Sequence, residues 1–140
     1  MISQSKRRRR GFTLVEVLLV LVILAIIMGM VGVAVFPRLE EAKIRATKTQ
    51  IDAFRTQLAQ YKLSVGDFPP DLGALRVPPA DAPNWRGPYA DKDIPPDPWG
   101  TQYSYQHPGQ HDEYPDIWSA GPDRISGTAD DIASWQPSQP

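Results

Sequence analysis

The stretch Gly11-Phe12-Thr13-Leu14-Val15-Glu16 and the apolar run that follows it, residues 17–36, decide the fold of this chain. The run holds no charged or strongly polar residue over about twenty positions, the length an α-helix needs to cross the hydrocarbon core of a bilayer. Five positive charges, residues 6–10, precede the stretch. The positive-inside rule places such a block on the cytoplasmic side. The sequence therefore predicts one membrane-spanning helix, with a cytoplasmic N-terminus and an exported remainder.

Glu16 is an acidic residue at the start of this apolar run. A charge at the centre of a membrane helix costs roughly 2.5–3.5 kcal/mol on insertion scales, and less near an end. Something should offset that cost, so Glu16 is the first candidate functional residue. The alternative is a plain membrane anchor in which Glu16 only reaches the interface.

Residues 10–17 resemble the class III signal of type IV pilins and pseudopilins. The resemblance implies that a prepilin peptidase removes a leader, residues 1–11, by cutting between Gly11 and Phe12. It also implies methylation of the new amine of Phe12. In an assembled filament, Glu16 of one subunit would pair with the cationic amine of Phe12 of its neighbour, and the low dielectric of packed helices would strengthen this pair.

The exported part is acidic and lacks cysteine. The chain has 15 Lys and Arg against 16 Asp and Glu, and residues 1–11 hold five of the positive charges and no acid. Ten positive and sixteen negative charges remain after cleavage, a net of −6, which disfavours nucleic-acid binding. Without cysteine, a small exported domain needs a staple other than a disulfide, and a metal ion is the obvious one.

Beyond Pro37 the apolar residues fall at helical spacing, which predicts an amphipathic continuation of the helix over residues 37–64. Gly66 should end this helix. The apolar face needs a partner within the chain, and residues 65–140 are the only candidate. The apolar face of the helix consists of Ile44, Ile51, Phe54, Leu58, Tyr61 and Val65.

Residues 65–140 are predicted to form a loop-rich periplasmic domain, since most of the fifteen prolines lie there. Asp71 should cap a short helix over residues 71–76. Alternating residues predict three short strands at 102–106, 116–120 and 132–135. The predicted fold is α+β and type IV pilin-like: a long N-terminal helix, membrane-spanning in its first half (residues 12–36), packed against a small antiparallel sheet.

The motif Asp97-Pro98-Trp99-Gly100, followed by Tyr103 and Tyr105, resembles major pseudopilins of type II secretion systems more than pilus pilins. Trp85 and Trp99 are flanked by proline and glycine, so we expect them to pin loops to the helix. The resemblance implies a structural subunit that polymerises with itself into a periplasmic pseudopilus and helps drive protein export across the outer membrane. It further implies minor pseudopilins and an inner-membrane assembly platform as partners.

An acidic loop near the C-terminus is a candidate calcium site. Hard oxygen ligands on a flexible loop suit Ca²⁺, although the spacing is not that of an EF-hand. Residues 119–123 and 129–132 resemble the segment where major pseudopilins bind calcium. The resemblance implies Asp123 and Asp130 as side-chain ligands, Asp131 as a ligand or cap, and carbonyls such as those of Ala120 and Ile125. An ordinary acidic surface loop is the alternative.

The sequence shows no catalytic constellation, so we predict that the protein is not an enzyme. His107 and His111 are expected to be exposed and without function. Two other functions stay open: a subunit of an adhesive or motility pilus, and a membrane-anchored periplasmic binding module. The second would use the aromatic residues around Trp85 and Trp99 as its pocket and predicts no cleavage at Gly11.

Overall fold

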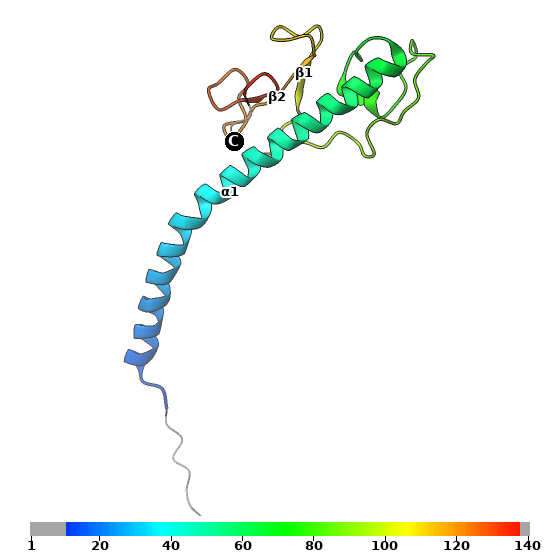
Figure 1. Cartoon of the computed structure of the whole chain (residues 1–140). Helices are drawn as coiled ribbons and strands as arrows, with labels where there is room; N and C mark the ends of the chain where they lie inside the picture. The colour runs from blue at the N-terminus through cyan, green and yellow to red at the C-terminus, as the bar shows by residue number, and fades with distance from the viewer. Residues whose placement is uncertain (1–10, 138–140) are drawn as a thin grey trace, which may run out of the picture. The chain divides into compact units, whose positions relative to one another are not determined.

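The computed structural model describes residues 11–137, apart from the side chains of residues 31–35. Residues 1–10 of the predicted leader therefore lie outside the described part. The elements in chain order are the helix α1 (Leu14–Val65), the 3₁₀ helix η1 (Leu72–Leu75) and the strands β1 (Ser104–Gln106), β2 (Asp116–Ser119) and β3 (Ile132–Ala133) (Figure 1). The chain divides into two compact units, Met1–Leu39 and Glu40–Pro140, which are described one at a time.

In the first unit, a reciprocal cap starts α1. The Glu16 backbone N–H donates to Thr13 Oγ1, and the Thr13 N–H donates to Glu16 Oε2, both at 3.3 Å. This arrangement is a capping box, which satisfies two backbone donors that a helix start leaves without partners. The helix consequently begins at Leu14, two residues later than the sequence predicted.

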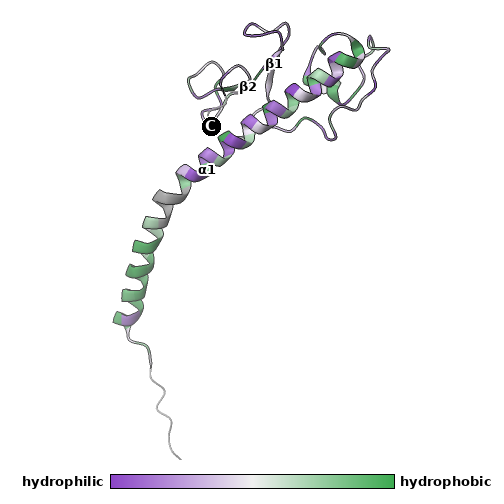
Figure 2. Ribbon diagram, viewed as in Figure 1, coloured by the Kyte–Doolittle hydropathy of each residue, from purple (hydrophilic) through white to green (hydrophobic). Residues whose placement is uncertain are grey.

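The first part of α1 presents apolar side chains to its surroundings. Every described residue from 11 to 30 is exposed, and Figure 2 shows this segment as predominantly hydrophobic. Among the described residues, no helix has both the length and the apolar character required of a membrane span. Pro37 lies inside α1 and does not end it.

In the second unit, the hydrophobic core forms along one face of α1. Ile51, Phe54, Leu58 and Tyr61 are buried, while Ile44 and Val65 are half-buried and pack against them. These six residues form the predicted apolar face, which is confirmed, because residues three or four apart share one side of a helix.

Gly66 ends α1 as predicted. Its φ of +103° belongs to the left-handed region that glycine enters without strain. Its N–H donates to the Lys62 carbonyl at 2.8 Å, which closes the last helical turn. After this turn, Asp71 caps η1 by accepting from the Ala74 N–H at 3.1 Å, so the expected short helix exists as a 3₁₀ turn.

The three strands form one antiparallel sheet in the order β1-β2-β3. Tyr105 of β1 pairs with Ile117 of β2, and Ser119 of β2 pairs with Ile132 of β3. Ile117 and Ile132 are buried, so β2 and β3 each contribute an apolar side chain to the core. The strands are shorter than predicted, but the α+β architecture is confirmed.

The two tryptophans of the long loop act as anchors, Trp99 to α1 as expected and Trp85 to the 3₁₀ helix η1 instead. The Trp85 indole donates to the Ala74 carbonyl of η1, and the Trp99 indole donates to Glu40 Oε2 of α1, both at 3.0 Å. Lys43 bonds to the other oxygen of Glu40 at 3.0 Å. The bonds from Lys43 and from Trp99 lower the pKa of Glu40.

Candidate metal loop and its supports

The acidic loop connects β2 to β3, and its two ends touch. Gly121 follows β2 and has a φ of +65°. A Cβ atom at Gly121 would lie 2.3 Å from the Asp130 carbonyl oxygen, so only glycine permits this approach. The sequence therefore needs glycine here for both backbone conformation and space.

Asp123 and Asp130, two of the three predicted carboxylate ligands, contact each other across this closed loop. The Asp123 N–H donates to Asp130 Oδ2 at 3.2 Å, and Asp123 Oδ1 accepts from the Ile125 N–H at 2.8 Å. The Thr128 hydroxyl donates to Asp130 Oδ1 at 2.5 Å. This hydroxyl bond, helped by the Asp123 N–H, lowers the pKa of Asp130. Asp130 is therefore a carboxylate at neutral pH.

Asp131 carries an oxygen that lacks a partner. Its Oδ2 accepts from the Gly127 N–H at 2.7 Å. Its Oδ1 is buried and has no hydrogen-bond partner among the described residues. A buried carboxylate oxygen left in this way is costly, and a cation would satisfy it. The donor chemistry of the loop therefore fits a hard cation such as Ca²⁺.

Among the described residues, no group of three or more acidic or histidine side chains lies close enough together to bind a metal ion. Ala120 is buried at the loop entrance, and the Ile125 carbonyl accepts from the Thr128 hydroxyl at 3.1 Å. Arg124, between these residues, is exposed and has a left-handed φ of 61°. The calcium assignment stays a prediction.

Asp97 supports the loop entrance from the core, which the sequence analysis missed. Its side chain is 4% exposed, and its Oδ1 accepts from the Trp99 and Thr101 N–H groups at 3.1 and 2.8 Å. Its Oδ2 accepts from the Ser119 hydroxyl at 2.6 Å, and Ser119 Oγ accepts from the Gly121 N–H at 3.1 Å. Aspartate bonding to backbone groups two residues on is a common turn feature, so the turn itself was predictable. The hydrogen bond from Ser119 to Asp97 was not predictable from the sequence.

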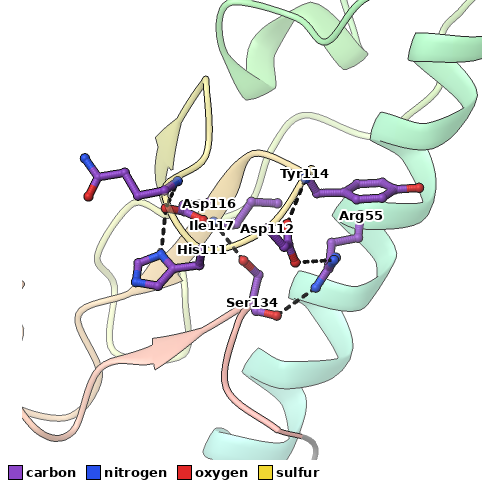
Figure 3. Close-up of polar contacts among 8 residues, drawn as sticks. Arg55, His111, Asp112, Tyr114, Asp116, Ile117 and Ser134 are labelled. Carbon is purple, nitrogen blue, oxygen red and sulfur yellow. Dashed lines mark hydrogen bonds and ion pairs between the residues drawn. The ribbon is translucent and has the colours of Figure 1, made fainter.

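Arg55 of α1 binds the segment that follows β3 and the loop that precedes β2 (Figure 3). Its guanidinium donates to the Ser134 carbonyl at 2.8 Å and to Asp112 Oδ2 at 2.9 Å, and it lies 5.0 Å from the centre of the Tyr114 ring. The Ser134 hydroxyl accepts from the Ile117 N–H at 3.1 Å. Arg55 thus ties the helix to the segment that follows β3.

His111 is exposed, as predicted, but it also has a structural partner (Figure 3). Its Nδ1 lies 2.8 Å from Oδ2 of the buried Asp116, which also accepts from the Gln110 N–H at 2.9 Å. Burial raises the pKa of Asp116, but the bonds from Gln110 and His111 outweigh it and leave that pKa below its ordinary value. The His111 ring stacks on Trp135 at 3.9 Å.

The predicted processing and assembly residues lie at the described start of the chain. Gly11 and Glu16 are exposed, and the Phe12 side chain is 82% exposed. The Glu16 carboxylate bonds to Thr13 of its own chain through Oε2. Both cleavage after Gly11 and pairing of Glu16 with a neighbouring Phe12 amine stay predictions.

Comparison with known proteins gives consistent matches over the two parts of the chain. A family described as type II secretion system (T2SS), protein G, matches residues 34–135, and the prokaryotic N-terminal methylation motif matches residues 6–32. The type II secretion system core protein G of Aeromonas hydrophila is 39% identical over 138 residues, which cover 94% of this chain and 95% of the relative. That of Pseudomonas aeruginosa is 36% identical over 140 residues, covering 94% and 98%. The crystal structure of the major pseudopilin from the type 2 secretion system of enterohaemorrhagic Escherichia coli matches with a TM-score of 0.65 and 31% identity, over 76% of this chain and 95% of that one.

Proposed function

Because the chain belongs to the protein G family of the type II secretion system, we propose that it works as the major pseudopilin of such a system. In this role it polymerises into a helical pseudopilus that helps drive proteins across the outer membrane. The observation that carries this function is the joint match of one chain to the protein G family and to the N-terminal methylation motif. The family consists of structural subunits, which agrees with the prediction that the protein is not an enzyme.

The comparisons favour this function over the two alternatives. A subunit of an adhesive or motility pilus would not be expected to match the protein G family over residues 34–135. A binding module with Trp85 and Trp99 in its pocket would need accessible indoles, whereas both indole N–H groups are bonded within the protein.

The proposed location is the inner membrane, with the N-terminus in the cytoplasm and Glu40–Pro140 in the periplasm. The basic residues 6–10 and the apolar residues 17–36 support this topology. Prepilin peptidase, minor pseudopilins and the inner-membrane assembly platform are the proposed partners, together with further copies of the chain.

Assembly is proposed to depend on the charge of Glu16. Cleavage after Gly11 leaves a cationic amine on Phe12, and Glu16 of the next subunit supplies the opposite charge between packed apolar helices. Both bonds to Thr13 use Oε2 of Glu16. Pairing through Oε1 therefore does not require the helix cap to break.

The experiment that tests this function separates the charge of Glu16 from its capping role. Glu16→Gln keeps the cap, because glutamine serves equally in a capping box, but removes the charge. Thr13→Ala keeps the charge and weakens the cap. Filament yield by electron microscopy and membrane insertion by carbonate extraction are measured in cells that express the secretion system.

We expect all three proteins to insert into the membrane. Filaments should form with wild type and with Thr13→Ala and should be lost with Glu16→Gln. Normal filaments from Glu16→Gln would overturn the proposed pairing, and loss of filaments only in Thr13→Ala would show that Glu16 acts as a cap.

Structural calcium is the second part of the proposal. Asp123, Asp130 and Asp131 would hold the ion with the carbonyls of Ala120 and Ile125. The ion would fix the last loop in a domain that has no disulfide. The buried Oδ1 of Asp131 supports this assignment, because it gives the ion an oxygen that no described residue satisfies.

Calcium binding is tested by thermal unfolding of the full chain in detergent with calcium, with magnesium or with a chelator. A ligand at 100 times its Kd stabilises the folded state by about 2.7 kcal/mol, so calcium should raise the Tm. This calcium-dependent rise in Tm should disappear in Asp131→Asn. It should persist in the control Asp93→Asn, because the Asp93 side chain is 97% exposed. Identical melting curves with calcium and with chelator would refute the site.

A further inference from the structure

Asp97 is a buried carboxylate that no function described so far explains. No ion pair to it occurs among the described residues, and all of its hydrogen bonds come from neutral groups. Burying a carboxylate is costly unless its oxygens are well bonded. Here three donors, two backbone N–H groups and one hydroxyl, meet that need. These three bonds connect the carboxylate to two parts of the second unit, the turn at residues 97–101 and the strand β2.

On one side, Asp97 fixes a tight turn that is itself fastened to α1. The Asp97 N–H donates to the Thr101 carbonyl at 2.8 Å, and the Gly100 N–H donates to the Asp97 carbonyl at 2.9 Å. Trp99 in this turn bonds to Glu40. The carboxylate therefore belongs to a part of the second unit that is rigidly attached to the helix.

On the other side, Asp97 reaches the acidic loop through Ser119. The Ser119 hydroxyl has one hydrogen, which it donates to Asp97, and this leaves its lone pairs for the Gly121 N–H. Gly121 is the residue whose backbone packs against the Asp130 carbonyl. The direction of these bonds thus fixes where the loop begins and, through the close approach to Asp130, where it ends.

We propose that Asp97 and Ser119 are positioning residues that hold the entrance of the acidic loop in the arrangement that binds calcium, and so set its calcium affinity. This inference rests on the calcium site proposed above. Neither residue touches the ion: Asp97 acts through the Ser119 hydroxyl, and Ser119 acts through the Gly121 amide.

The bond directions make a specific prediction for Asp97→Asn. If the amide nitrogen of the new side chain faces Ser119, it donates to Ser119 Oγ, which then receives two donors while its own hydrogen has no acceptor in this chain of bonds. If the amide is flipped, the two backbone N–H groups of the turn face a donor instead. Either orientation disrupts the relay, meaning the two hydrogen bonds that link Asp97 to Ser119 and Ser119 to Gly121, while preserving the size of the side chain. Ser119→Ala removes the relay without adding a group.

Three variants of the full chain in detergent are compared with wild type: Asp97→Asn, Ser119→Ala and the control Leu75→Val. Leu75 is fully buried in η1 and makes its backbone bonds with Tyr89 and Ala90, outside this relay. Removing one methylene there lowers the stability by about 1 kcal/mol without touching the relay. The calcium Kd is measured by titration calorimetry, and hydrogen exchange of the loop amides of Asp123, Ile125 and Gly127 is measured without calcium.

We expect Asp97→Asn and Ser119→Ala to weaken calcium binding at least tenfold and to speed exchange of the loop amides at least tenfold. Leu75→Val should change neither by more than about twofold despite its lower Tm. Unchanged affinity and exchange in both relay variants, or equal changes in the control, would overturn the inference. Absence of calcium binding to wild type would instead overturn the calcium site, and the exchange data would then test the loop positioning alone.

Discussion

Arg55 is the helix residue on which attachment of the C-terminal segment should depend most. It joins α1 to Ser134 beyond β3 and to Asp112 in the loop before β2. We predict that Arg55→Met, which keeps most of the aliphatic stem and removes the guanidinium, lowers the free energy of unfolding by about 2–3 kcal/mol.

This magnitude follows from three contacts of the guanidinium. The bond to the Ser134 carbonyl involves a charged donor and contributes about 1.5 kcal/mol, the low end for such bonds, because Ser134 is half-buried. The pair with Asp112 contributes about 0.5 kcal/mol, because the two side chains are 29% and 40% exposed and solvent screens them. The contact with the Tyr114 ring adds about 0.5 kcal/mol.

Urea unfolding followed by tryptophan fluorescence measures this loss. All four tryptophans lie in Glu40–Pro140, so the signal reports that unit within the full chain in detergent. At an m-value of about 1.5 kcal/mol/M, the midpoint should fall by about 1–2 M.

The matched control for this experiment is Arg45→Met on the same helix. Arg45 is 74% exposed and, among the described residues, forms its one ion pair with Glu41 one turn earlier, so its loss should cost less than about 0.5 kcal/mol. The urea midpoint of Arg55→Lys should lie between those of Arg55→Met and Arg45→Met. Equal midpoints for Arg55→Met and Arg45→Met would refute the assigned role of Arg55.

Three further predictions concern the loops around the sheet. The pKa of Asp116 is lowered in the folded protein, so its contribution to stability is present above its unfolded pKa of about 3.9 and is lost as the pH falls further. Between pH 6 and pH 3, wild type should therefore lose more stability than Asp116→Asn in urea titrations, and parallel curves would contradict this. Arg124→Gly should raise the unfolding free energy by about 0.5–1 kcal/mol, because Arg124 has a left-handed φ of 61° that glycine adopts freely; a drop in urea midpoint would argue against it. Gly109→Ala should cost more than about 3 kcal/mol, because its Cβ would lie 2.0 Å from the Tyr114 carbonyl oxygen; a soluble variant with the wild-type Tm would show that the loop can move.

The local features of the fold were predictable because they depend on residues close together in sequence. The apolar face of α1 follows from helical spacing, and its end follows from Gly66. The Asp71 cap and the three strands follow from similarly short patterns. The pattern Thr13-x-x-Glu16 is equally local and signals a capping box, a role that neither the pairing interpretation of Glu16 nor the membrane-anchor alternative includes.

The supports of the acidic loop were not predictable, because their partners meet only after folding. Arg55 lies 57 residues from Asp112 and 79 from Ser134, and Asp97 lies 22 from Ser119. With 16 acidic residues in the chain, no spacing rule selects Asp97 for burial. Packing of the second unit decides this, and the sequence carries no short-range signal for it.

The most direct test of the central claim, that a processed N-terminus joins copies of this chain into a filament, is the N-terminal residue of the mature protein. The chain is expressed with a prepilin peptidase, and its intact mass and N-terminal sequence are determined. The account predicts a chain that lacks residues 1–11 and begins with N-methylated Phe12. A mature protein that keeps Met1, or one that is cut anywhere other than after Gly11, would contradict it.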